Sequence, residues 1–262
     1  MTVHEIVALK FAQHHRGRRV DFFHGSAAEP IADPASIDYY VWLIRSPEQT
    51  ILLDAGYTPE VAVLRNRPDY YRSPSEAVAL AGVSPADVSH VILSHLHYDH
   101  SGDLDAFTGA TIVLQAEELS FWTGRHAHRH ELARQVEFDD IRNVVRLNEA
   151  GRVLIVDGDH EVVPGVTVHK LGGHTPGMQA VRVETASGPI VLASDASHLR
   201  ANIDADAPAA VFTDLPGMYD GFDRMIELAG GDVARVIPGH DPGLLGSIPA
   251  VPGLEGIAGI VA

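Results

Sequence analysis

SHLHYDHSG, Ser94 to Gly102, carries His95, His97, Asp99 and His100 within six positions. In an extended segment, residues two positions apart point to the same side, so the first two histidines present their imidazoles together. The backbone must then turn, and the aspartate and the third histidine point elsewhere. The segment therefore offers two pairs of ligands, one for each of two neighbouring metal ions. A solvated histidine-rich turn is the ordinary alternative, but the apolar residues VIL before the motif predict a buried strand that leads into it.

Three other motifs supply the further ligands that two metal ions need. LGGHTPGM carries His174 on a Gly-Gly turn, LASDASH carries Asp195 after an apolar strand, and VIPGHDPG carries His240 in a Pro-Gly turn. All three lie just past predicted strands, where residues from distant parts of the sequence can meet at one edge of a sheet. Asp195 is the best candidate for a bridge, because each carboxylate oxygen can bind one cation. We expect two divalent metal ions, with zinc as the first choice, although histidine and aspartate also suit manganese, iron and cobalt.

Composition narrows the classes of function. The chain has 262 residues, long enough to bury a sizeable core, so a metal is expected to be catalytic rather than structural. It has no cysteine, which excludes disulfides, thiolate zinc sites, iron–sulfur clusters and cysteine nucleophiles. A formal net charge of −16 argues against a nucleic-acid partner. We see neither a signal peptide nor an apolar run that could span a bilayer, so we expect a cytoplasmic protein without membrane contact.

The rest of the sequence predicts strands and helices in a single domain, residues 1–262. Short apolar runs predict strands, and a serine before a glutamate and an apolar run predicts a helix start. The predicted strands are 4–11, 19–23, 39–46, 50–56, 89–97, 151–159, 165–173, 179–195 as a hairpin, and 233–241, with helices at 73–83, 123–148 and 217–231, and a strand followed by a helix at 110–122. The Pro/Gly-rich tail 242–262 is predicted to pack loosely on the surface. This order suggests sheets with helices on the outside.

The motifs SHLHYDHSG, GGHTPGM, ASDAS and IPGHD, in this order, resemble the metallo-β-lactamase superfamily. LLDAG, residues 52–56, is similar to the Asp-Thr-Gly-type turn of that superfamily. The resemblance implies an α/β (α+β) fold, a four-layer αββα sandwich, with a dinuclear site. The ligands that it implies are His95, His97 and His174 for one metal, and Asp99, His100 and His240 for the other, with Asp195 bridging them.

Within the superfamily, HLHYDHSG and GGHTPGMQA are most similar to the N-acyl-homoserine-lactone lactonases, a quorum-quenching group. This implies attack of metal-bound hydroxide on a lactone carbonyl, with Asp99 accepting or relaying the proton. Tyr98 or His198 would add a hydrogen-bond donor to the oxyanion. The lactonase group commonly has a tyrosine three residues after the bridging aspartate, where this chain has His198. An imidazole reaches less far than a phenol and titrates near neutral pH, so this departure bears on the substrate more than on the hydrolase class.

Several alternatives stay open from the sequence. The same scaffold could hydrolyse organophosphotriesters, thioesters or β-lactams, and a metal-binding sensor without activity is a third class. The expected partner is a small lactone or ester, with a homodimer as an open alternative. A further cluster, HAHRHE, places His126 and His130 four positions apart; we interpret it as the solvated face of a helix rather than a second metal site.

Overall fold

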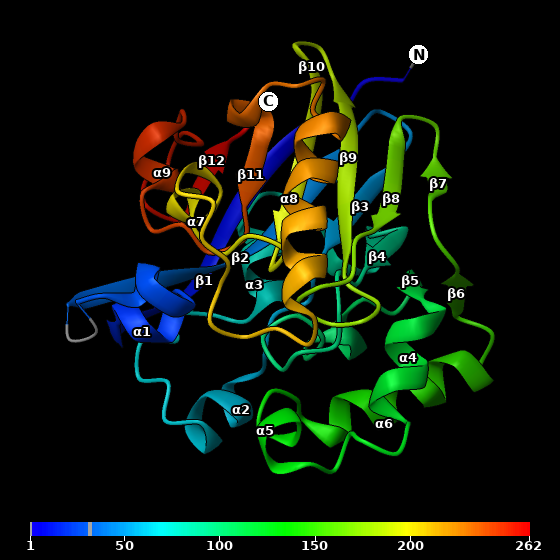
Figure 1. The fold of residues 1–262 in the computed structure, drawn as a ribbon. Helices are drawn as coiled ribbons and strands as arrows, with labels where there is room; N and C mark the ends of the chain where they lie inside the picture. Colours follow the sequence, from blue (N-terminus) through cyan, green and yellow to red (C-terminus); the bar gives the residue numbers. More distant parts are fainter. Residues whose placement is uncertain (1, 31–32) are drawn as a thin grey trace.

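Two β-sheets form the centre of the computed structural model, which describes residues 2–30 and 33–262 (Figure 1). In these residues the first sheet has seven strands in the order β12-β1-β2-β3-β4-β5-β6. Its members β3 to β6 run parallel to one another, and the other neighbours are antiparallel. The strands are β1 (Glu5–Arg18), β2 (Pro34–Arg45), β3 (Thr50–Leu53), β4 (His90–Ile92), β5 (Thr111–Gln115), β6 (Val153–Val156) and β12 (Ala258–Ile260).

The second sheet packs face to face on the first. Its order is β11-β10-β9-β8-β7, with β10 and β11 parallel and the other neighbours antiparallel. Trp42 and Ile44 of the first sheet and Val181 and Leu192 of the second belong to one buried apolar cluster between the sheets. The strands are β7 (His160–Val163), β8 (Val166–Lys170), β9 (Gln179–Thr185), β10 (Gly188–Ser194) and β11 (Val236–Pro238).

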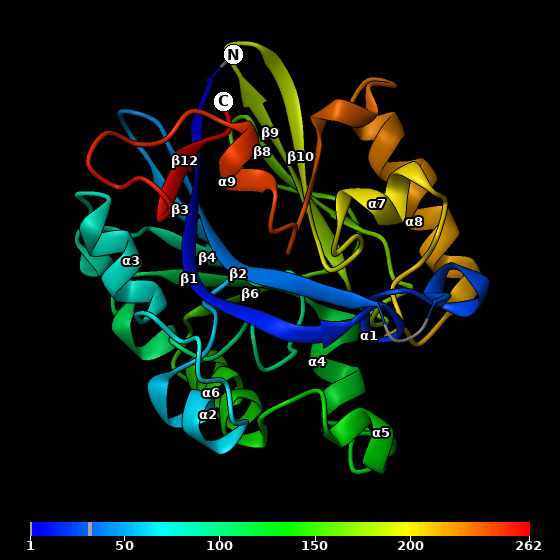
Figure 2. The same cartoon turned by 90° about the vertical axis from the view of Figure 1, so that its left-hand side faces the viewer.

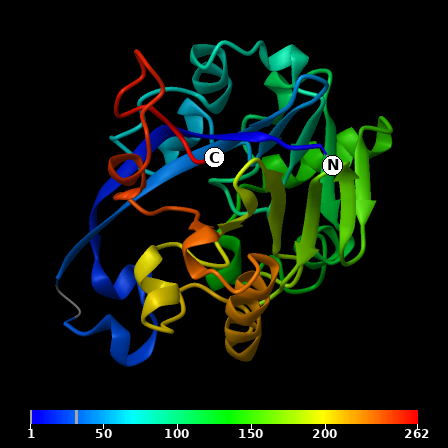
Figure 3. The same cartoon turned by 90° about the horizontal axis from the view of Figure 1, so that it is seen from above.

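Helices cover the two outer faces and complete four layers. Phe222 and Met225 of α8 pack on Ala180 and Val191 of the second sheet, on the side opposite to α2, α3 and α6 (Figure 2). From above, α8, the second sheet and the first sheet follow one another as successive layers (Figure 3). The helices are α1 (Arg19–Phe22), α2 (Pro59–Leu64), α3 (Pro74–Leu80), α4 (Ala116–Trp122), α5 (His130–Ala133), α6 (Phe138–Glu149), α7 (Arg200–Asp204), α8 (Leu215–Leu228) and α9 (Leu244–Ser247), with 3-10 turns η1 (Gly25–Ala28), η2 (Pro85–Asp87), η3 (Leu104–Ala106) and η4 (Val233–Arg235). The predicted αββα sandwich is confirmed.

Two predictions for the ends of the chain are wrong. Residues 19–23, predicted as a strand, begin with the short helix α1, and β1 extends through Arg18. The tail 242–262 is not loosely packed, because it forms α9 and the edge strand β12, which pairs with β1. The last residue, Ala262, accepts a hydrogen bond from the Ile6 amide at 2.9 Å.

Four strands bring the candidate site together at one edge of the sandwich. The chain leaves β4 at residue 92, β8 at residue 170, β10 at residue 194 and β11 at residue 238, and a predicted metal-ligand motif follows each of them. Two hydrogen bonds join the sheets there. The backbone amide of Gln179 donates to the Ser94 carbonyl at 3.0 Å, and the Ser194 hydroxyl donates to the Ser94 hydroxyl at 2.9 Å. Among the residues that the structure describes, no helix has the length and apolar character needed to cross a membrane.

Candidate metal centre

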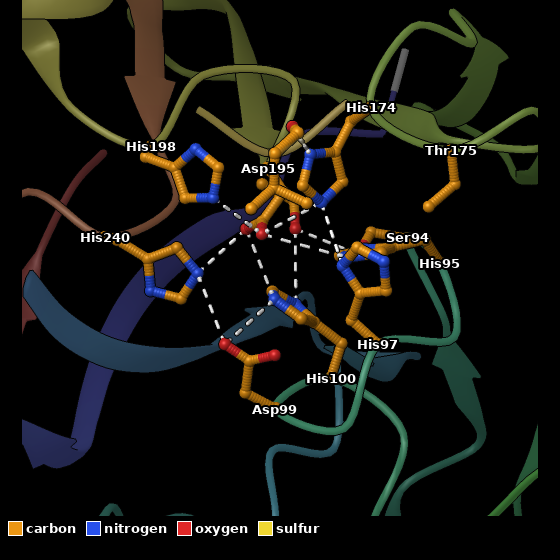
Figure 4. A network of polar contacts seen from close by, with 12 residues as sticks. Ser94, His95, His97, Asp99, His100, His174, Thr175, Asp195, His198 and His240 are labelled. Carbon is orange, nitrogen blue, oxygen red and sulfur yellow. Dashed lines mark hydrogen bonds and ion pairs between the residues drawn. The ribbon is translucent and has the colours of Figure 1, made fainter. Parts of the chain in front are cut away.

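The seven side chains predicted as metal ligands meet at this edge and are buried (Figure 4). They come from four separate segments of the chain, so the fold, and not local sequence, assembles them. In sequence order they are His95, His97, Asp99, His100, His174, Asp195 and His240.

The first group of ligands combines the start of the motif with two distant residues. His95, His97, His174 and Asp195 each offer one ligand atom within 4.8 Å of the others. His97 Nδ1 lies 2.9 Å from His174 Nε2, and His174 Nε2 lies 3.3 Å from Asp195 Oδ2. This group can hold one cation with three nitrogens and one oxygen.

The second group lies on the other side of the same carboxylate. Asp99, His100 and His240 offer ligand atoms within 4.8 Å of one another. Asp195 Oδ1 faces this group, at 3.2 Å from His100 Nε2 and 2.8 Å from His240 Nε2. Because Oδ2 faces the first group and Oδ1 the second, the Asp195 carboxylate lies between two candidate cation positions.

The hydrogen bonds around the histidines fit metal ligands. The Nδ1 atoms of two imidazoles contact backbone carbonyls at 2.8 Å, that of His174 with Val211 and that of His240 with Asp38. A carbonyl only accepts, so Nδ1 carries the proton and Nε2 presents its lone pair to the centre. The atoms that are buried there without a hydrogen-bond partner are Nε2 of His95, His100 and His240 and Oδ1 of Asp195. Such atoms are rare in proteins, and a divalent cation would satisfy them.

The electrostatics of the centre favour cations. Burial, reinforced by the neighbouring histidines, lowers the pKa of His95 and His97 well below the usual value, so both are neutral and able to bind a metal. Burial also disfavours a charged His100, yet the Asp195, Asp54 and Asp99 carboxylates outweigh it and raise the pKa of His100. The carboxylates thus create a negative potential that attracts positive charge into the centre.

Asp54, within the LLDAG turn, holds the motif in place. Its Oδ1 accepts from the Ser94 amide at 2.8 Å, and its Oδ2 contacts the Ser94 hydroxyl at 3.0 Å, the Ser194 hydroxyl at 3.0 Å and His100 Nδ1 at 2.8 Å. Both Asp54 (φ 63°) and Ser194 (φ 45°) adopt left-handed backbone conformations that disfavour residues other than glycine. The hydrogen bonds stabilise this strained backbone and orient His100.

Glu118 of α4 joins two ligand segments, and the sequence analysis missed it. Its Oε1 accepts from the Leu96 amide at 2.9 Å and the Trp122 indole at 2.7 Å. Its Oε2 accepts from the Thr175 hydroxyl at 2.7 Å and the Gly177 amide at 3.0 Å. The fully buried carboxylate therefore links the segment of His95 and His97 to the one of His174. A glutamate in a helix after a strand carries no sequence signal for this role.

Tyr98 lies beside the centre. Its hydroxyl is 2.9 Å from Arg67 Nη2, which donates, and 3.2 Å from the Tyr39 hydroxyl. Burial raises the pKa of Tyr98 to about 12, so the phenol stays protonated at neutral pH.

His198 points at the carboxylate that lies between the two groups. Its Nε2 is 3.0 Å from Asp195 Oδ2, and its ring stacks on that of His240 at 5.5 Å. Asp195, His198 and His240 also offer ligand atoms within 4.8 Å of one another. The Nδ1 atom of His198 is buried without a hydrogen-bond partner. His198 therefore contacts the ligands of the centre directly.

The HAHRHE cluster lies apart from the centre. His126 precedes α5 in a turn, so His126 and His130 do not share a helix face as predicted. Both are exposed; Arg125 donates to His126 at 2.9 Å, and His130 contacts Glu131 at 3.1 Å.

A cavity of about 320 Å³ opens above the centre. Asp99, His198 and His240 line it together with Tyr98 and Arg67. An adjoining cavity of about 350 Å³ shares some of its lining, and its apolar residues are Val20, Trp122, Leu132, Ala210, Val211 and Phe212. A small substrate can thus place a polar group near the centre and an apolar group beside it.

Comparison with known proteins identifies the family of the chain. A family model described as the metallo-beta-lactamase superfamily matches residues 38–240. An N-acyl homoserine lactonase of Bacillus sp is 30% identical over 236 residues, which cover 83% of this chain and 88% of that protein. The N-acyl homoserine lactonase AiiB of Agrobacterium fabrum is 29% identical over 223 residues, 76% of this chain and 78% of its own.

Solved structures show the same architecture. The crystal structure of a quorum-quenching N-acyl homoserine lactone lactonase matches with a TM-score of 0.76 and 26% identity, over 96% of this chain and 98% of that chain. That of a quorum-quenching N-acyl homoserine lactone hydrolase matches with a TM-score of 0.73 and 25% identity, with the same coverage. The chain belongs to the metallo-β-lactamase superfamily and is a hydrolase related to the N-acyl homoserine lactonases.

Proposed function

We propose that this protein is a hydrolase that binds two divalent metal ions, with zinc expected from the ligand chemistry, and that it opens lactone rings, with N-acyl homoserine lactones as the leading substrates. The observation that carries the proposal is the Asp195 carboxylate, whose two oxygens face two separate groups of histidines. A site for a single cation would need only one of these two oxygens as a ligand. The lactonase relatives support the substrate class.

The chemistry is the addition of water to the lactone carbonyl. When bound, the cations would lower the pKa of water toward 7 and polarise the carbonyl. Water adds to the carbonyl carbon, the ring C–O bond breaks, and one proton moves from the water to the leaving oxygen, which gives a hydroxy acid. Asp99 lines the cavity with its carboxylate in the second group, so it can accept that proton and pass it on.

We propose that Tyr98 stabilises the oxyanion. Its oxygen accepts a hydrogen bond from Arg67, and Tyr39 can donate to the second lone pair. The phenol proton of Tyr98 is then free for a substrate oxygen in the cavity that it lines. A preorganised donor of this kind is worth about 10²–10³ in kcat in other hydrolases.

For His198, the geometry supports a positioning role: its ring lines the cavity, but its Nε2 is directed at Asp195 Oδ2, 3.0 Å away. We expect His198→Phe to weaken metal binding and activity by about 10- to 100-fold, as loss of a partner of a metal ligand does elsewhere. His198→Gln, which keeps a donor, should lose less. Chelator competition measures metal affinity. Unchanged affinity in His198→Phe with lost activity would instead place His198 on the substrate.

A substrate panel tests the function. Zinc- or cobalt-loaded protein is given N-hexanoyl homoserine lactone, an organophosphotriester, a thioester and a chromogenic β-lactam. We expect kcat/KM for the lactone to exceed the others by about tenfold or more, a difference that transition-state recognition readily provides. A higher value for another substrate would replace the lactone with that class, and no turnover of any would favour a metal-binding sensor.

A further inference from the structure

Two arginines flank Tyr98, and Arg65 is the one with a structural role. Its guanidinium lies 3.8 Å from the centre of the Tyr98 ring. It donates through Nε to Glu137 at 2.6 Å, through Nη1 to the Arg134 carbonyl at 2.8 Å and through Nη2 to the Val136 carbonyl at 2.9 Å. Each of its nitrogens has a protein partner, and Glu137 balances its charge.

Arg67 differs in having no counterion. Past α2, Asn66 adopts a left-handed conformation (φ 51°) and the Arg67 amide donates to the Ala62 carbonyl at 2.8 Å, which turns the chain back toward the cavity. Nη2 of Arg67 donates to Tyr98, whereas its Nε is buried without a partner. In the described residues, no carboxylate lies within 4.0 Å of the Arg67 nitrogens, since none of the ion pairs found there includes it.

The guanidinium faces the cavity above the metal centre. Arg67 lines it together with Tyr98, Tyr39 and His240. The Tyr98 and Tyr39 hydroxyls are 3.2 Å apart, and the Tyr39 and His240 rings are 5.4 Å apart, so two phenols join Arg67 to the second group of ligands. Asp21 also lines the cavity, but its carboxylate accepts from the Arg18 amide at 2.8 Å.

A partly buried cation without a counterion loses hydration, and the single hydrogen bond from Arg67 to Tyr98 restores only part of it. A guanidinium has five N–H donors in a planar fork, which matches the two oxygens of a carboxylate. The chain as a whole carries a formal net charge of −16 and repels anions, so an anionic substrate needs a local cation at the site.

We propose that Arg67, held by Tyr98, is the anion-binding subsite of this cavity, and that it selects lactones with a carboxylate close to the ring. The inference rests on the proposed lactonase function and adds a preference within it: N-acyl homoserine lactones carry no carboxylate, so a lactone that does carry one should be opened with a higher kcat/KM. The carboxylate of the substrate would take the free donors of Arg67 while the lactone carbonyl reaches the metal centre. A neutral lactone would leave these donors unpaired.

A matched pair of substrates tests the subsite. 5-Oxotetrahydrofuran-2-carboxylate and its carboxamide are γ-lactones of the same shape that differ in charge. In the wild type, kcat/KM should favour the carboxylate, and Arg67→Met should lower the carboxylate-to-carboxamide ratio by about 10- to 100-fold, the value of a charge-assisted hydrogen bond. Arg134→Met is the control, because it removes the same charge from an exposed residue of the cavity rim that pairs with Glu131 at 3.2 Å. Its ratio should change by less than about twofold.

The remaining outcomes are distinct. If Arg67→Met slows both lactones equally, Arg67 serves the ring or the scaffold, and the subsite is overturned. If Arg67→Met does not fold, Arg67→Lys is tested in its place. A carboxylate-to-carboxamide ratio of kcat/KM equal to that of the wild type would then contradict recognition by the planar guanidinium. If the wild type opens neither lactone, the proposed function fails. The subsite is then tested separately by measuring the binding of glutarate to the wild type and to Arg67→Met by calorimetry. Binding that Arg67→Met loses supports the subsite, and equal binding by the two proteins refutes it.

Discussion

Asp195→Asn is expected to abolish lactone opening and to remove most of the bound metal. An amide offers one oxygen and one N–H₂ group, so it cannot give an oxygen to each of the two groups of ligands. The N–H₂ group of the asparagine would also point at His240 or His174. The Nδ1 atoms of these histidines carry the protons, so their Nε2 lone pairs face residue 195, and the N–H₂ group would occupy a lone pair that the cation needs. We expect kcat to fall by about 10³ or more, as for loss of a catalytic group. Metal content by mass spectrometry and lactone hydrolysis measure the two effects.

His97→Ala should give the same double loss, since it removes a ligand from the first group. His126→Ala is the matched control: it removes an exposed histidine outside the centre and should keep metal content and rate. An Asp195→Asn or His97→Ala protein with full turnover and full metal content would contradict the dinuclear centre.

Glu118→Leu is expected to produce the largest loss of stability. The leucine has about the same volume but leaves the Leu96 and Gly177 amides, the Trp122 indole and the Thr175 hydroxyl without their acceptor. Each unpaired buried donor costs about 1–3 kcal/mol, and after relaxation we expect the free energy of unfolding to fall by about 3–5 kcal/mol. Urea denaturation measures it.

Metal affinity should fall with Glu118→Leu as well, because two ligand segments lose their common anchor. Glu117→Leu is the control: this neighbour is exposed and pairs with Lys170 at 3.0 Å, so its removal should cost about 1 kcal/mol or less. If Glu118→Leu unfolds at the same urea concentration as Glu117→Leu and binds metal normally, Glu118 has no positioning role.

The clustering of the seven candidate ligands could be predicted from the sequence because their chemistry is visible in residue type and spacing. A histidine or aspartate just past an apolar strand stands out whatever its partners are, and strand ends meet at a sheet edge. Glu118 and Arg67 offer no such signal. Glu118 lies within a helix beside a second glutamate, and Arg67 follows a helix among polar residues, so both look solvated in the sequence. Only the packing of α4 and the turn after α2 bring them beside the centre.

The same limit applies to the fold. Short apolar runs predicted most strands of both sheets, since burial on two faces leaves a strong pattern, but they did not predict β7 (His160–Val163). Residues 19–23 looked like a strand by composition, but the chain turns there into α1. In the tail, the many glycines and prolines gave β12 no recognisable strand pattern. This strand forms because it pairs with the free edge of β1, and not because of the strand propensity of residues 258–260.

The most direct measurement is the rate of N-hexanoyl homoserine lactone opening as metal-free protein is loaded stepwise with zinc, with bound zinc counted at each step. If two cations share Asp195, the rate should reach its maximum only as the second equivalent of zinc binds, and the hydroxy acid should be the sole product. Full loading without ring opening would contradict lactone hydrolysis, and a maximal rate at one equivalent would contradict a dinuclear centre.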